Sequence, residues 1–285
     1  LARELAGVAV LLLAPYRADE LSPQQRLFHL LPSLVREAQA TRLDLIPLDA
    51  DDLRALVRAH YALSSWNEGR LVAYLGERAD GNPLFAGELL RHLEETRVLK
   101  SVAQGWMLGG LAHAGVPPFL RHVLDSRLRR LGEETYHLLA LAAVIGQEVA
   151  PGLWSTVAGI ASESLEPVVA RAVEAHLLVI NTDGLRLRFV HALVREVLYA
   201  GIALPRRQVW HRQIAEILQA VPVPDPDVVA YHLRLADDPR AAEWLIRAGE
   251  RAQRADAWVT AAARYQAALQ LADSCGLDRA ECGWL

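Results

Sequence analysis

Few residues of this chain have the type and spacing that catalysis requires. A phosphate-binding (Walker A) loop needs glycines whose backbone N–H groups surround the phosphates, followed by a lysine. The only lysine, Lys100, stands in RVLKS with no glycine before it. The patterns GxGxxG, HExxH, CxxC and GxSxG are missing as well, and the 10 histidines show no paired ligand spacing. We therefore expect no catalytic residue and no metal ligand in this chain.

Three short stretches could nevertheless contact a ligand. VLLLAPYRADEL ends an apolar run in Arg17, and a guanidinium at the carboxyl end of a buried strand suits an anion in a crevice. ADGNPLFAGELLRHL opens a helix, and RFVHALVREVLY contains His191. Each stretch also has a simpler explanation. Arg17 could form an ion pair with Asp19 or Glu20, the second stretch could be an ordinary helix cap, and His191 could be a buried histidine bonded to the backbone.

The elements that would position these stretches begin with an α/β segment. The aliphatic run Gly7 to Ala14 predicts a parallel strand buried on both faces. Ser22 to Ala40 predicts a helix with a serine cap and a proline in its first turn, and Leu43 to Leu48 predicts a second strand. We interpret residues 1–48 as the last strands of a parallel-sheet domain.

Residues 49–112 predict a small helical domain. Helices are expected over Asp51 to Ala62, Glu68 to Ala79 and Asn82 to Arg97, because apolar residues recur at helical spacing and Asn before Pro is a good helix start. Val98 to Leu108 then predicts a hairpin. The glycine- and proline-rich residues 109–118 predict a linker.

Residues 113–221 predict a winged helix. Three helical stripes precede two apolar arms, which flank Thr182, Asp183 and Gly184; Asp-Gly between such arms is a strong hairpin signal. The stripes cover Phe119 to Leu131, Glu133 to Ile145 and Ser162 to Ala175. The arms are Leu177 to Asn181 and Leu185 to Val190, and the helices Ala192 to Tyr199 and Arg206 to Leu218 follow them.

Residues 222–285 predict the first helices of a repeat array. The proline-spaced segment Pro222 to Pro226 separates them from what precedes. Helices are expected over Val228 to Leu235, Arg240 to Gln253 and Ala257 to Ala272. Small alanines alternate there with large aromatic residues, as in tetratricopeptide-like helix pairs, and the array is expected to continue past Leu285. The fold class we predict is mainly α with a small α/β remnant.

In this order, the three stretches resemble the STAND class of signalling ATPases, which includes NB-ARC proteins and the large ATP-binding LuxR-type transcription regulators. The resemblance implies that Arg17 senses the terminal phosphate, that Gly81 and Asn82 shape a turn, and that Pro83 packs on the adenine ring. His191 takes the place of a histidine that touches the diphosphate of ADP. Ala192 replaces the aspartate that follows this histidine in the family, which weakens the match.

The resemblance implies an internal piece of a larger switch, without its Walker motifs. ATP or ADP, with Mg²⁺, would bind only together with an N-terminal P-loop half, so the parent protein is expected to be a slow ATPase and this piece its lid and signal relay. A protein or small-molecule inducer would bind the repeat helices. DNA would be bound only by a C-terminal LuxR-type domain outside this sequence, although a cyclase or kinase effector stays open. The alternative is a helical scaffold that binds proteins without any nucleotide.

Composition agrees with these expectations. The formal net charge is −4, and residues 113–219 carry 11 arginines against 10 acidic residues, a weak electrostatic footprint for nucleic acid. The longest apolar run, Leu5 to Pro15, is too short for a membrane span and lacks the flanks of a signal peptide. The two cysteines, Cys275 and Cys282, suggest no disulfide framework. We therefore expect a cytoplasmic protein.

Overall fold

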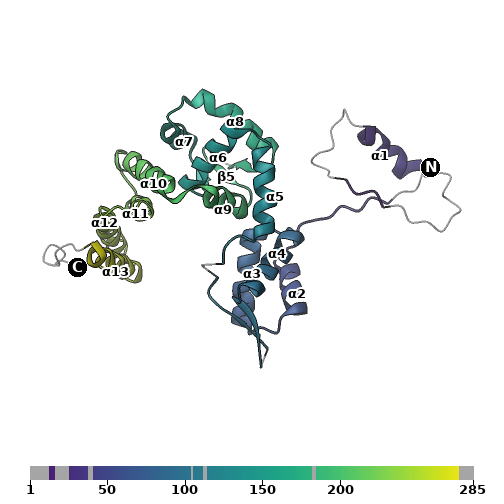
Figure 1. Cartoon of the computed structure of the whole chain (residues 1–285), viewed down its shortest axis with the longest axis horizontal. Helices are drawn as coiled ribbons and strands as arrows, with labels where there is room; N and C mark the ends of the chain where they lie inside the picture. Colours follow the sequence, from purple (N-terminus) through teal and green to yellow (C-terminus); the bar gives the residue numbers. More distant parts are fainter. Residues whose placement is uncertain are drawn as a thin grey trace. The chain divides into compact units, whose positions relative to one another are not determined.

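The computed structural model describes residues 13–16, 26–37, 41–103, 105–111, 114–181 and 184–275. This part of the chain is mainly helical, with thirteen helices and five short strands (Figure 1). All of its strand pairs are antiparallel. By its internal contacts the chain divides into two units, Leu1–Pro47 and Leu48–Leu285.

The first unit agrees only in part with the predicted α/β remnant. Its helix α1 spans Arg26–Glu37, inside the predicted helix. The predicted strand at Leu43 to Leu48 is wrong: residues 41–49 form no strand, and Leu45 and Ile46 are 96% and 81% exposed. A strand buried on both faces requires neighbouring strands, and none pairs with this segment among the described residues. Most of the predicted strand Gly7 to Ala14 lies outside the described residues.

The second unit begins with three helices and a hairpin, which we call the first helical segment (Figure 1). Its helices are α2 (Ala50–His60), α3 (Ser65–Ala79) and α4 (Pro83–Glu95), and its strands β1 (Leu99–Val102) and β2 (Gly105–Leu108) pair antiparallel. Polar caps start all three helices: the side chains of Asp49, Ser64 and Asn82 accept backbone N–H groups of the first turns. The predicted helices and hairpin are confirmed here within a few residues.

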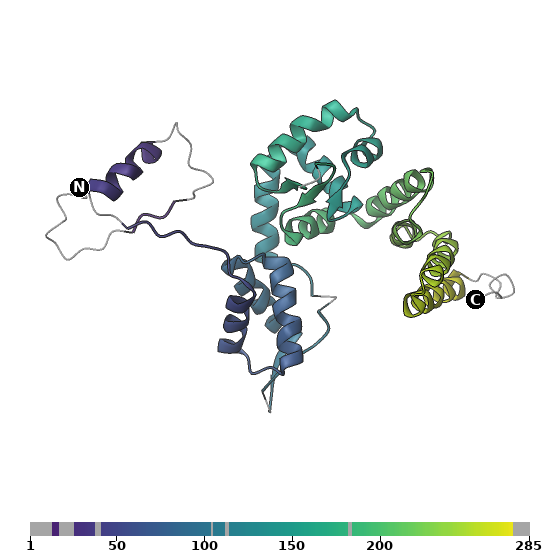
Figure 2. The same cartoon turned by 180° about the vertical axis from the view of Figure 1, so that it is seen from behind.

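The sheet-containing segment follows, visible from behind in Figure 2. It comprises α5 (Pro118–Arg129), α6 (Glu133–Ile145), β3 (Glu148–Val149), α7 (Pro151–Ala158), α8 (Ser162–Glu174), β4 (Leu178–Ile180), β5 (Leu187–Phe189) and α9 (Ala192–Gly201). Three strands form one antiparallel sheet in the order β3-β5-β4. The hairpin around Gly184 is confirmed. The sequence analysis missed β3 and α7, because two residues are too few to show strand alternation and α7 is only 8 residues long.

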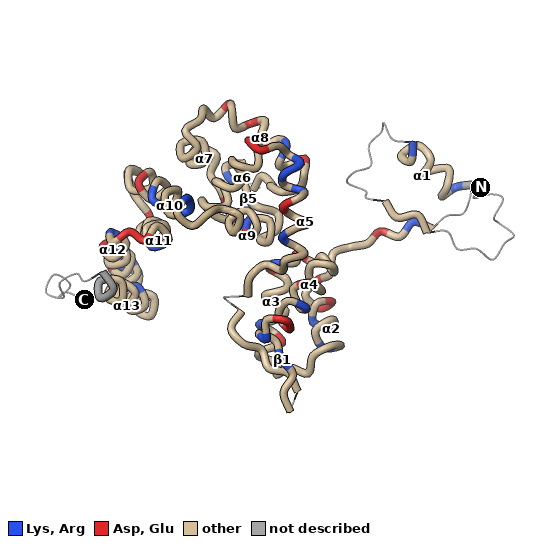
Figure 3. Tube along the Cα trace, viewed as in Figure 1, with Lys and Arg blue, Asp and Glu red and all other residues tan. Residues whose placement is uncertain are grey.

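The C-terminal helices complete the second unit. They are α10 (Leu204–Gln219), α11 (Pro226–Leu235), α12 (Ala241–Arg254) and α13 (Trp258–Cys275). Each packs on the next, from α10 to α13. Basic and acidic positions are interspersed along α10 to α12 (Figure 3). All four helices match predicted helical segments.

Two apolar cores hold the second unit together. The larger runs without a break from Leu53 of α2 to Ile214 of α10, so the first helical segment and the sheet-containing segment share one core. The smaller core begins one residue later, at Ala215, and continues through α11 and α12 to Ala268 of α13. Helix α10 therefore belongs to both cores and connects them.

One glycine permits the close packing of α12 and α13. A Cβ on Gly249 would lie 2.5 Å from Cε1 of Tyr265, whereas a Cβ on Gly87 in α4 would meet no atom within 4 Å. Overpacking costs about 1–3 kcal/mol, more than the roughly 1 kcal/mol that alanine gains over glycine in a helix. We expect Gly249→Ala to destabilise the fold and Gly87→Ala to stabilise it slightly, as measured by urea unfolding. Two stabilising changes would show that the Tyr265 ring moves aside freely.

Candidate functional site

The turn between α3 and α4 carries three of the residues singled out in the sequence. Helix α3 ends in Asp80 and Gly81, whose φ angles of 47° and 73° are left-handed. The Asn82 side chain then accepts the backbone N–H groups of Leu84 and Phe85, and Pro83 occupies the first turn of α4. The carbonyl of Gly81 accepts the N–H of Leu48 at 2.8 Å. The turn is therefore held by hydrogen bonds to the first turn of α4 and to the segment that precedes α2.

His191 lies against this turn, although it comes from a distant part of the chain. It stands at the N-cap of α9, directly after β5. Its Nδ1 atom is 3.1 Å from Oδ2 of Asp80. Its ring contacts Phe85 edge-on, with 6.2 Å between the ring centroids. The fold thus brings His191 to the turn that contains Gly81, Asn82 and Pro83.

The surroundings of His191 favour its neutral form. Burial lowers the pKa of His191, and the positive charges of Arg127 and Arg188 lower it further, whereas Asp80 opposes them. The Nδ1 atom is buried, and the carboxylate of Asp80 stands close to it without the alignment of a hydrogen bond. Asp80 is therefore the polar group that faces this ring nitrogen.

An ion pair joins the helices on either side of this site. Arg78 of α3 contacts Glu196 of α9, with 2.7 Å between Nη2 and Oε1. The guanidinium of Arg78 also lies over the ring of Tyr74, 4.5 Å from its centroid. Both charged side chains are mostly buried, so water and salt screen this ion pair less than they would screen a fully exposed one. It holds the end of α3 against the first turns of α9.

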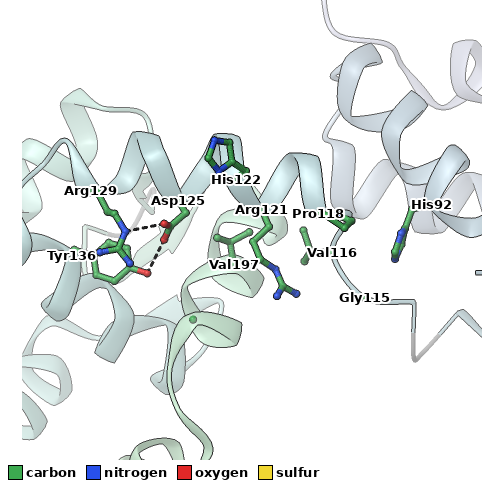
Figure 4. A pocket seen from close by; sticks show the side chains of 11 residues that line it. His92, Gly115, Val116, Pro118, Arg121, His122, Asp125, Arg129, Tyr136 and Val197 are labelled. Atoms are coloured by element: carbon green, nitrogen blue, oxygen red, sulfur yellow. Dashed lines mark hydrogen bonds and ion pairs between the residues drawn. The ribbon is translucent and has the colours of Figure 1, made fainter. Parts of the chain in front are cut away.

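The contact at His191, as far as the structure describes it, includes neither Arg17, a predicted position, nor the concave site of the fold. Arg17 lies outside the described residues, so its proximity to the turn stays a prediction. The concave site shown in Figure 4 also does not coincide with the turn: its lining comes from α4, α5, α6, α9 and the connection before α5, and includes none of Gly81, Asn82, Pro83 and His191. The residues around His191 therefore form a contact between segments that is separate from this concave site.

A buried polar cluster at α10 was missed in the sequence analysis. Tyr199 of α9 lies 3.0 Å (Oη to Nε2) from His211 of α10, and Nδ1 of His211 lies 2.8 Å from Nδ1 of His232 in α11. The two histidines are 0% and 1% exposed. Burial lowers their pKa values to about 4 and about 3, helped by nearby arginines and, for His232, by His211. No motif spacing could reveal this pair, because it depends on how α10 and α11 pack.

Comparison with known proteins identifies no family for this chain. No family model matches the sequence. The chain is 30% identical over 183 residues to an uncharacterized protein of Rhizobium meliloti (strain 1021); the match covers 62% of this chain and 17% of that protein. The chain thus spans only a small part of the relative's length. The class that the structure defines is a mainly helical protein with a few short antiparallel strands.

Among the described residues, no helix combines the length and the apolar character needed to cross a bilayer.

Proposed function

We propose that this chain is the lid and signal-relay portion of a nucleotide-dependent switch of the STAND class, most similar to the ATP-binding LuxR-type regulators. In this proposal the first helical segment is the lid, the sheet-containing segment together with α10 is a winged helix, and helices α11 to α13 begin a tetratricopeptide-like array. The order of these parts along the chain supports the proposal, because it is the order that the sequence resemblance implies.

The observation that carries the proposal is the contact between His191 and the Asp80–Pro83 turn. The resemblance assigns both elements to one nucleotide, although they are far apart in the sequence. In the fold, Nδ1 of His191 is 3.1 Å from Asp80. A structure with His191 in a different region would have removed the basis for a shared ligand.

The residues around His191 fit a phosphate group in part. The buried Nδ1 atom lacks a hydrogen bond, and Arg127 and Arg188 add positive charge nearby. Asp80 is unfavourable, since its carboxylate would repel a diphosphate unless it turns away or is protonated. Arg127 and Arg188 would attract the negative charge of bound ADP or ATP, neutral His191 would donate a ring N–H to a phosphate oxygen, and Pro83 would face the adenine ring. Arg17 would contact the terminal phosphate, and Mg²⁺ would belong to the P-loop half.

The exposed segment 41–47 supports a role next to a further domain. Leu43, Leu45 and Ile46 are 77%, 96% and 81% exposed in an extended stretch that pairs with no described strand. Several exposed aliphatic residues close together are unfavourable in water, so such a stretch is expected to be covered. A further domain of the parent protein would cover it.

The contacts of α9 support a relay. At its start lies His191, its second turn bears the Arg78–Glu196 pair, and near its end Tyr199 reaches the histidine pair of α10 and α11. A shift of α9 would therefore act on the lid directly and, through His211 of α10, on His232 of α11. Nucleotide exchange would change the population of docked and undocked lids, and α9 would transmit that change.

The test is ADP affinity in the protein that includes the upstream P-loop half. We expect Pro83→Ala and His191→Ala each to weaken ADP binding about tenfold in isothermal titration calorimetry, the effect of about 1.4 kcal/mol of lost contact. Arg17→Ala should weaken ATP binding more than ADP binding. The control is His60→Ala, an exposed residue of α2, which should leave the affinity unchanged.

Two results would contradict the proposal. One is an unchanged affinity in all three variants; the other is an upstream reading frame without Walker A and Walker B motifs. The second result would favour the alternative function, a scaffold that binds proteins without nucleotide. Exposed apolar residues on the C-terminal helices are the observation in its favour, among them Trp258 and Val259 at 60% and 87% exposure. The effector, whether a DNA-binding domain, a cyclase or a kinase, lies outside this sequence.

A further inference from the structure

A concave site opens where the first helical segment meets the sheet-containing segment. Its volume is about 650 Å³, within the range of small-molecule sites. One wall comes from His92 of α4, and the other walls come from α5, α6 and α9 (Figure 4). Nothing in the proposed nucleotide contact uses this site, because it shares no residue with the turn beside His191.

The centre of the site is apolar and open. Val116 and Val197 are both buried and line it together with Pro118. Gly115 also lines it, and a Cβ at that position would meet no atom within 4 Å. The site can therefore accommodate a short hydrocarbon chain.

The negative charge in the site is already neutralised. Asp125 accepts hydrogen bonds from Nε of Arg129 at 2.8 Å and from the hydroxyl of Tyr136 at 3.0 Å (Figure 4). Burial raises the pKa of Asp125, but these two hydrogen bonds outweigh it and hold the pKa below its usual value. Asp125 is therefore ionised and paired, and it is not available to repel an anion.

Arg121 has the free positive charge. Its side chain makes no hydrogen bond, ion pair or ring contact within the described part of the chain, and it extends past Val116 and Val197 (Figure 4). A guanidinium presents paired N–H donors that match a carboxylate or a phosphate. Other arginines of the surface are also unpaired, but Arg121 stands over an apolar floor in a concavity.

From this arrangement we propose that the site binds a small amphipathic acid. Its carboxylate or phosphate group contacts Arg121, and its hydrocarbon part covers Val116 and Val197. Because the walls belong to α4 on one side and to α5 and α9 on the other, the bound acid adds contacts between the two segments and stabilises their docking. The proposal does not depend on nucleotide binding.

Three probes with the same six-carbon chain test it: hexanoate, hexyl phosphate and hexan-1-ol, titrated into the ¹⁵N-labelled chain and followed by amide chemical shifts. We expect an acid to perturb the amides around Gly115, Arg121 and Val197, and the alcohol to bind at least about fivefold more weakly because it lacks the charge. Comparison of the two acids shows whether a carboxylate or a phosphate is preferred.

Two variants and a control accompany the titration. Arg121→Gln should weaken binding of the better acid about tenfold, the loss of one charge-assisted hydrogen bond. Gly115→Leu should block the site by filling its open floor. Arg130→Gln, at the end of the same helix but outside the site, should leave binding unchanged. The dispersion of the amide spectrum verifies that each variant is folded.

The proposal is overturned by any of three results in folded protein: no perturbation by either acid, equal binding of hexan-1-ol and the acids, or equal binding to Arg121→Gln and the unchanged chain.

Discussion

Truncation of Trp154 to alanine is expected to lower the free energy of unfolding by about 3–5 kcal/mol, the usual cost of removing a buried aromatic side chain. Trp154 lies in α7, is 0% exposed and belongs to the larger core. Its indole N–H donates to the carbonyl of Leu138 in α6 at 3.0 Å, so the substitution removes a hydrogen bond as well as packing. The measurement is urea unfolding monitored by circular dichroism.

Trp66→Ala is the matched control. Trp66 lies in α3, is 71% exposed and stacks only with the guanidinium of Arg70, 4.6 Å from the ring centroid. Its truncation should cost less than about 1 kcal/mol, as for other exposed contacts. Similar losses in the two variants would contradict the burial of Trp154.

The Trp154 variant also tests whether the larger core is one cooperative unit. Because that core runs from α2 to α10, loss of packing in α7 should lower hydrogen-exchange protection in α3 and α4 too. Protection lost only in α5 to α9 would mean that the first helical segment unfolds separately. The lid in the proposed switch could then respond to nucleotide without straining its neighbour.

Acidification is expected to destabilise the protein through His211 and His232. Their pKa values in the fold, about 4 and about 3, are lower than the value of about 6.5 in an unfolded chain. Stability from this pair is therefore complete above pH 6.5. Below it, the unfolded chain takes up protons that the folded chain cannot, so stability falls toward pH 4.

The size of the effect follows from linkage. Each histidine contributes up to about 1.4 kcal/mol per pH unit between its two pKa values. We expect a loss on the order of 3 kcal/mol between pH 6.5 and 4.5, smaller than the full sum because the histidines of the unfolded chain are only half protonated at pH 6.5. Arg195 of α9 and Arg207 of α10 face the pair and disfavour its protonation further. Tyr199 and Tyr231 are the other aromatic groups in contact with His211.

Urea unfolding at pH 4.5 to 7.5 measures the dependence, and His232→Gln should remove about half of the part of its slope that comes from the pair. The slope is the useful quantity, because a general loss of stability in the variant shifts the whole curve without flattening it. His60→Gln, at an exposed site on α2, should leave the slope unchanged. A slope equal in His232→Gln and the unchanged chain would show that the pair is not buried as described.

Helix positions were largely predictable from the sequence. Local signals decide where helices start and stop: Asp49, Ser64 and Asn82 accept backbone N–H groups in the first turns of α2, α3 and α4. The hairpin at Gly184 likewise followed from Asp-Gly between apolar arms. The strand predicted at Leu43 to Leu48 failed because an apolar run forms a strand only when another strand is available to pair with it.

The sequence could indicate which residues belong to the candidate site, but it could not predict that they contact one another. Gly81, Asn82 and Pro83 could be recognised from their order alone, since it defines a helix entry. That Asp80 and Phe85 contact His191 could not be, because the contact depends on how α3 and α4 pack against α9. The same holds for the free charge of Arg121, which depends on Asp125 being paired with Arg129.

The amino-acid sequence alone determined the helical character of this chain and the bounds of most of its helices, because these depend on neighbours within a few residues. Tertiary structure decided which side chains meet: His191 with Asp80, Tyr199 with His211, and His211 with His232. The physical reason is that burial and charge act over a few ångströms in space, and only packing makes distant residues neighbours.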